Sequence, residues 1–155
     1  PMNNIARMAT ELGVVRICPV TTEHTSVTRA NTPRMRSNAV EAAAQSARLN
    51  VPIVDEATSL ESMFAHWDPS RRVILCAEKG SAEPIPNALG RIKTGGSWAV
   101  LIGPEGGFSQ SELDGLVKLP FVTPVRLGPR VLRADTAAAA ALVCWQNYLG
   151  DWSEQ

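Results

Sequence analysis

The sequence feature that most constrains the fold is an apolar run, Trp98 to Ile102, that leads directly into a glycine-rich segment. The run, WAVLI, does not alternate between polar and apolar residues, which is typical of a strand in a parallel sheet with helices on both faces. Gly103 to Gly107 follow, and Ser109 and Glu112 then form a Ser-x-x-Glu capping box ahead of Leu113. The segment predicts a strand, a glycine loop and a helix in direct succession.

The same arrangement is repeated immediately afterwards. Residues 121–127 are typical of a strand, residues 128–134 of a loop, and Asp135 or Thr136 caps an alanine-rich helix that continues to residue 149. Two consecutive units of this kind predict an α/β fold in which helices flank a mostly parallel sheet. Such folds bind ligands in a crevice at the carboxyl ends of the strands.

The first half of the chain also alternates between strands and helices. We expect a helix over residues 5–12 that ends at Gly13, a strand over 14–20, a polar loop over 21–36, an alanine-rich helix over 37–49, a strand over 51–54, a helix over 60–67 and a buried strand over 73–77 that runs into a polar, proline-containing loop. This order agrees with one α/β unit.

Composition excludes several classes of protein. At 155 residues with 45% hydrophobic and 19% charged residues, the chain predicts one soluble domain, and neither disorder nor a membrane span. Fifteen basic residues balance fifteen acidic ones, so the net charge of zero lacks the basic excess of most nucleic-acid-binding proteins. Any RNA contact must come from a local patch or from another domain.

The cysteines and histidines indicate neither a disulfide framework nor a metal site. Cys18, Cys76 and Cys144 are odd in number, widely spaced and next to apolar runs, which is typical of buried free thiols. Only His24 and His66 accompany them, and no group has metal-ligand spacing. We expect a cytoplasmic protein without a bound metal.

The loop over residues 103–107, GPEGG, has the composition of a main-chain binding site. Glycines allow positive φ and close approach of a ligand, and the proline stiffens the turn. The loop matches neither the phosphate-binding GxxxxGK pattern nor the dinucleotide-binding GxGxxG pattern. Taken alone, it is equally consistent with a tight turn.

The second loop places Arg130 and Arg133 beside the start of a helix. Exposed arginines are usually solvated, yet two guanidinium groups next to a helix N-terminus suit an anion such as an RNA phosphate. The alanine run over residues 137–141 favours close packing of this helix more than contact with a ligand.

Taken together, the two loops resemble a known family. The segments GPEGGFSxxE and LGxRVLRxDTAxAA resemble the paired motifs of the bacterial 16S ribosomal RNA uracil-N3 methyltransferases, which belong to the SPOUT superfamily. ATELGV at residues 9–14 and EAAAQSAR at residues 41–48 are similar to two further family segments, so the resemblance covers nearly the whole chain. Met8 and Asp135 depart from the family pattern, where lysine and glutamate are usual.

The resemblance implies a fold and a cofactor. It implies a SPOUT fold with a deep C-terminal trefoil knot, a homodimer, and S-adenosylmethionine held mainly by the backbone of three loops. The residues that this implies for cofactor binding are Cys76, Ala77, Leu101, Gly103, Pro104, Gly106, Gly107, Leu127, Gly128, Arg130, Leu132 and Ala134.

The implied reaction is methylation of N3 of a uridine in small-subunit ribosomal RNA. N3 of uracil is a weak acid, so a base or a cation that stabilises the anion is needed. Among charged groups near the implied cofactor site, we assign Arg133 as electrostatic stabiliser, Glu105 as base or orienting group, and Arg130 as a further catalytic candidate. A contact between Glu105 and a helix dipole in its own loop is an equally good interpretation.

Arg48, Gln45 and Arg133 are the candidates for RNA contact, although a solvated helix face explains the first two as well. Family members begin with a β-barrel RNA-binding domain, and residues 1–155 show no pattern for one, so we expect the catalytic domain alone. The expected partners are 16S ribosomal RNA or the small subunit and a second copy of the chain, with no membrane contact. The rival hypotheses are a cofactor- or nucleotide-binding α/β module without catalysis, and a SPOUT enzyme acting on ribose hydroxyls or transfer RNA.

Overall fold

The computed structural model describes residues 2–25, 30–78, 82–93 and 95–154. Its centre is a four-stranded sheet with the order β6-β8-β5-β7, in which every neighbouring pair is parallel. The strands are β5 (Arg72–Cys76), β6 (Glu83–Pro84), β7 (Trp98–Ile102) and β8 (Val122–Arg126). The predicted α/β class with a parallel sheet is therefore confirmed.

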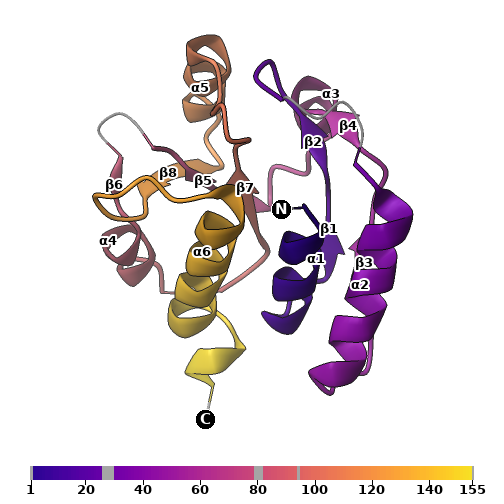
Figure 1. The fold of residues 1–155 in the computed structure, drawn as a ribbon. Coiled ribbons are helices and arrows are strands. Elements are labelled where there is room, and N and C mark those ends of the chain that lie inside the picture. Colours follow the sequence, from indigo (N-terminus) through magenta and orange to yellow (C-terminus); the bar gives the residue numbers. More distant parts are fainter. Residues whose placement is uncertain (1, 26–29, 79–81, 94, 155) are drawn as a thin grey trace.

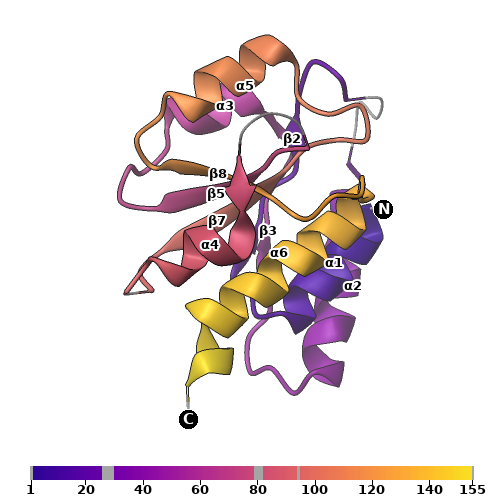
Figure 2. The same cartoon turned by 90° about the vertical axis from the view of Figure 1, so that its left-hand side faces the viewer.

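Helices cover both faces of this sheet, as the uninterrupted apolar strands predict (Figure 2). Val73 and Leu75 point to one face, where α3 (Leu60–Ala65) and α5 (Gln110–Val117) pack over them. Ile74, the residue between them, points to the other face and joins a second core. That core is formed with α4 (Ile85–Gly90) and α6 (Ala134–Tyr148). Because side chains alternate across a strand, one apolar run supplies both cores.

The first half of the chain forms a layer beside this sheet. Its elements are α1 (Met2–Glu11), β1 (Arg16–Ile17), β2 (Val20–Thr21), α2 (Thr32–Gln45), β3 (Ile53–Val54) and β4 (Thr58–Ser59). The short strands pair in parallel as β1 with β3 and β2 with β4. Helix α1 lies between α2 and α6 (Figure 1) and packs against both. Gln146 of α6 fastens this contact by donating a 2.6 Å hydrogen bond to the carbonyl of Leu12.

The position of β8 decides how the chain is connected. Strands β5 and β6 follow each other in sequence, yet β8 pairs with both and lies between them. The C-terminal part of the chain therefore enters the sheet between two strands that the chain has already joined. This strand order agrees with the SPOUT fold that the resemblance implies.

Four expected elements were wrong in part. The loop expected over 21–36 is helical from Thr32, because Asn31 caps α2 through a 3.2 Å hydrogen bond from the amide of Arg34 and Pro33 lies in the first turn; residues 26–29 lie outside the described part. The strand expected over 14–20 is divided at Cys18 and Pro19 into β1 and β2.

The loop expected after residue 77 contains β6 and α4. The last helix begins at Ala134, capped by Arg133 without a side-chain hydrogen bond, so the expected cap at Asp135 or Thr136 was also misplaced. Elements β6 and α4 were missed because both are short and this region contains prolines. The cap of α6 was misplaced because the polar residues Asp135 and Thr136 lie two and three residues after the actual N-cap, Arg133.

Candidate functional site

Three connecting segments meet at the carboxyl edge of the sheet. The register pairs Cys76 with both Ile102 and Val125, so the three central strands end at the same level. The segments that begin there are Ala77 after β5, the glycine loop over 103–107 after β7, and the arginine loop over 127–133 after β8 (Figure 1). The structure therefore brings together the three segments that the sequence resemblance implied.

The glycine loop turns tightly on itself. Its turn is closed by a 2.8 Å hydrogen bond from the amide of Gly107 to the carbonyl of Pro104, and Gly107 has a φ of 73° that favours glycine. A Cβ on Gly103 would lie 2.9 Å from the ring of Phe108, so the start of the loop is packed by its own chain. A Cβ on Gly107 would meet nothing within 4 Å, so its backbone faces open space.

The helix after the glycine loop starts where the sequence predicts. The side chain of Ser109 accepts a 3.1 Å hydrogen bond from the amide of Glu112, and Glu112 Oε1 accepts a 2.9 Å bond from the amide of Ser109. This completes the predicted capping box and fixes the exit of the loop.

A contact between this loop and the N-terminal half of the chain was not predicted from any sequence pattern. His24 Nδ1 lies 3.0 Å from the carbonyl oxygen of Gly106, and a Cβ on Gly106 would lie 3.0 Å from the Cβ of His24. One residue earlier, the amide of Glu23 donates a 3.2 Å hydrogen bond to Glu112 Oε2. The segment around His24 thus rests on both the glycine loop and the cap of α5, with a sequence separation of 82 residues that no local pattern reveals.

The arginine loop is largely exposed. Arg130 and Arg133 are exposed, Leu132 is half-buried, and Val131 is 80% exposed. Arg133 is the N-cap residue of α6, so this residue lies at the free amides and the positive dipole end of that helix. A Cβ on Gly128, whose φ is 96°, would meet nothing within 4 Å.

Three charged candidates have side chains free to act. Within the described residues, no hydrogen bond or ion pair involves the side chain of Glu105, Arg130 or Arg133. Glu105 is exposed in the turn of the glycine loop. Asp135 instead accepts a 3.0 Å hydrogen bond from the amide of Thr136.

Three further cofactor candidates, Cys76, Ala77 and Leu101, lie in the sheet or directly after a strand. Burial, with a smaller contribution from Cys144, raises the pKa of the Cys76 thiol to about 12, so it stays neutral and acts as an apolar lining. The amide of Ala77 donates to the carbonyl of Val125 at 3.0 Å. Leu101 is buried in the core beneath α3 and α5. Only its backbone position associates it with the glycine loop.

Arg48 and Gln45 lie elsewhere. Gln45 is the last residue of α2 and Arg48 follows it, whereas the arginine loop leads into the start of α6, away from this end of α2 (Figure 1). Gln45 is exposed, but the guanidinium of Arg48 donates 2.8 Å hydrogen bonds to the carbonyls of Thr10 and Val14 and a 3.1 Å bond to Asn50. The structure does not bring these two residues together with Arg133.

The described residues contain neither a membrane-spanning helix nor a metal-binding cluster. None of the helices in that part of the chain combines the length and apolar character needed to cross a bilayer. No three His, Cys, Asp or Glu side chains there are grouped as ligands for a metal ion.

Comparison with known proteins identifies the family. Residues 1–146 match the model of the RNA methyltransferase domain, and the chain belongs to this family. It is 32% identical over 138 residues to ribosomal RNA small subunit methyltransferase E of Rickettsia conorii, an alignment that covers 87% of this chain and 54% of that protein. The chain therefore spans about half the length of this relative.

Solved structures show the same fold. A ribosomal RNA small subunit methyltransferase E from Neisseria gonorrhoeae bound to S-adenosylmethionine superposes with a TM-score of 0.83 at 28% identity, covering 97% of this chain and 62% of that one. A methyltransferase from Legionella pneumophila in complex with the same cofactor superposes with a TM-score of 0.78 at 28% identity, covering 94% and 60%. The predicted SPOUT fold is thereby confirmed.

Proposed function

We propose that this chain is the catalytic part of an S-adenosylmethionine-dependent methyltransferase that modifies N3 of a uridine in 16S ribosomal RNA. The observation that carries the proposal is the meeting of the glycine loop and the arginine loop at one edge of the sheet, with the side chains of Glu105 and Arg133 unengaged in the described structure. The relatives named for small-subunit ribosomal RNA methylation support the choice of substrate.

The backbone of these loops fits a bulky, mostly neutral cofactor. Gly107 and Gly128 have positive φ and face open space, so a ligand can approach their main chain closely. The neutral thiol of Cys76 and the half-buried Leu132 add apolar surface. We assign S-adenosylmethionine to this edge, with the other loop residues that the resemblance implies.

When bound, S-adenosylmethionine supplies a methyl carbon made electrophilic by its positively charged sulfur. The residues of the chain must place uracil N3 in line with this carbon and accept the N3 proton as the new N–C bond forms and the C–S bond breaks. Glu105 is the group we assign to accept or direct the proton. Arg133, beside the positive end of α6, stabilises the negative charge that develops on the uracil ring. Arg130 is assigned to the cofactor and the substrate side of the same loop.

A base in folded RNA must leave its stack to reach these loops, so we expect the uridine to be splayed out. We further propose that the enzyme works as a homodimer in the cytoplasm on the small subunit or its RNA. The alignments cover 54% and 62% of the two relatives, and the remaining parts of those proteins are available for additional RNA contacts.

The test has two stages. Calorimetric titration with S-adenosylmethionine, ATP and NAD should show binding of the methyl donor alone. Incubation with unmethylated 16S ribosomal RNA should then transfer a labelled methyl group, and reverse transcription should stop at one uridine, because a methyl group on N3 blocks base pairing. Cofactor binding without transfer to any RNA would favour the α/β binding module, and a methylated ribose or transfer RNA would favour another SPOUT activity.

A further inference from the structure

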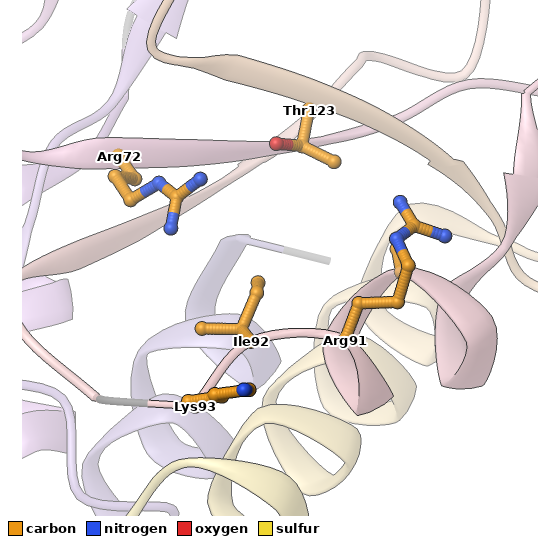
Figure 3. A pocket seen from close by; sticks show the side chains of 6 residues that line it. Arg72, Arg91, Ile92, Lys93 and Thr123 are labelled. Carbon is orange, nitrogen blue, oxygen red and sulfur yellow. The ribbon is translucent and has the colours of Figure 1, made fainter.

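A cationic hollow of about 360 Å³ lies at the amino end of the strands, on the edge opposite the cofactor loops (Figure 3). It is lined by Arg72, Ala88, Arg91, Ile92, Lys93 and Thr123. Because Thr123 pairs with Ile74, and Arg72 precedes Ile74 by two residues, these side chains share the sheet face that α4 covers. Helix α4 ends at Gly90, and the sheet beyond its end is left open.

The hollow keeps an excess of positive charge. Arg91 forms a bidentate ion pair with Glu83, which neutralises it. Arg72 and Lys93 have no ion pair among the described residues. Because the whole chain has no net charge, two uncompensated cations in one polar hollow are a local feature and not part of a general basic surface.

The guanidinium group of Arg72 is oriented by Trp98 and keeps its N–H donors available. Its guanidinium carbon lies 4.8 Å from the ring centroid of Trp98, a contact that orients the planar group without using its N–H donors. In Figure 3 the guanidinium of Arg72 and the hydroxyl of Thr123 point toward the same space. In the described part of the chain, neither group takes part in a side-chain hydrogen bond. A guanidinium fork with a neighbouring hydroxyl, in a hollow that Lys93 also lines, suits a tetrahedral oxyanion.

We propose that this hollow binds a backbone phosphate of the RNA substrate, as a second contact separate from the methyl-transfer site. The inference rests on the proposed function, which makes RNA the available source of phosphate. The hollow and the cofactor loops lie at opposite ends of five-residue strands, which separates them by about 15 Å at roughly 3.3 Å per residue. An RNA that reaches both sites must therefore run along the length of these strands. The contact fixes the orientation of the RNA and does not read its sequence.

The test is the salt dependence of RNA binding by the full chain, measured by fluorescence anisotropy with transcribed 16S ribosomal RNA. Each lost phosphate contact reduces the slope of log K against log [salt] by about 0.7 to 0.9. Because the two cations surround one phosphate, we expect the double variant Arg72→Gln, Lys93→Gln to lower the slope by about 0.7 to 0.9 and the affinity at least tenfold. Thr123→Val, which leaves the stacking of Arg72 on Trp98 intact, should weaken binding by several fold.

Lys118→Gln is the matched control, because it removes an exposed lysine at the end of α5. It should leave affinity and slope unchanged, and cofactor affinity should be the same in all variants. Wild-type affinity and slope in both the double variant and Thr123→Val would overturn the proposal. The proposal would also be overturned if the wild-type chain bound inorganic phosphate and the double variant lost this binding without any change in RNA affinity. The hollow would then be a site for small anions only.

Anisotropy does not require methyl transfer, so this proposal and the proposed function fail separately. A chain that binds RNA through the hollow and transfers no methyl group refutes the function alone. A chain that methylates RNA equally well with and without the hollow, at all salt concentrations, refutes the hollow alone.

Discussion

Replacing Arg48 distinguishes a role in stability from the role in RNA binding for which the sequence makes it a candidate. Its guanidinium donates to the carbonyls of Thr10 and Val14 at 2.8 Å each, across the C-terminal end of α1, and to Asn50 at 3.1 Å. These bonds join α1 to the chain that follows α2. A positive charge at this place also interacts favourably with the negative end of the α1 dipole.

The magnitude follows from these three bonds. Hydrogen bonds from a charged donor contribute about 1.5–3 kcal/mol each when desolvated, but Arg48 is only half-buried and water can replace part of each bond. We therefore expect Arg48→Ala to lower the free energy of unfolding by about 2 kcal/mol in total. For a chain of this size, that corresponds to a fall in Tm of about 4–8 °C.

The assay is urea unfolding followed by circular dichroism, alongside RNA affinity by anisotropy. Arg48→Lys should recover part of the loss, because an ammonium group keeps the charge but lacks the guanidinium fork. The matched control is Gln45→Ala in the same exposed helix end, expected to change stability by less than about 0.5 kcal/mol. Unchanged stability of Arg48→Ala with weakened RNA binding would refute the structural role and restore the RNA role.

Three further predictions concern the site and its thiols. Arg133→Ala should abolish methyl transfer and spare affinity for S-adenosylmethionine; equal loss of both would place this residue in the cofactor site. Gly106→Ala should weaken cofactor binding about tenfold, or 1.4 kcal/mol, because the new Cβ would lie 3.0 Å from the Cβ of His24. The control Gly115→Ala should leave cofactor binding unchanged, because its Cβ meets nothing within 4 Å. Equal effects of the two substitutions would exclude a role for the contact between Gly106 and His24. Burial raises the pKa of Cys76 from 9.0 to about 12, so the thiol of the unfolded chain loses its proton first and the free energy of unfolding should fall as pH rises from about 9 to 12. Urea titrations of Cys76→Ala should show a shallower fall with pH. An identical dependence of stability on pH in the two proteins would contradict the assignment.

Local signals predicted the elements around the site well. The apolar run of β7, the glycine loop and the capping box of Ser109 and Glu112 were all confirmed, because each depends on residues within a few positions of one another. The turn at Gly107 likewise depends on a hydrogen bond over three residues.

Features that depend on distant partners were missed. The sequence offered Arg48 either an RNA contact or a place on a solvated helix face. Its bonds to Thr10 and Val14 were missed because these partners lie more than thirty residues earlier in the sequence. The contact of His24 with Gly106 spans 82 residues and depends on how two loops of different layers pack. Short elements were missed for another reason: β6 and α4 have too few residues to show a period.

The central place of β8 has a consequence for how the protein is made. Synthesis delivers residues 122–126 after the other strands that the structure describes, and yet β6 pairs with the sheet through β8. Until those residues emerge, β5 presents an open, apolar edge and β6 has no strand to pair with. Nascent chains that pause before this point expose a template for aggregation, so the last fifth of the sequence acts as the closing step of folding.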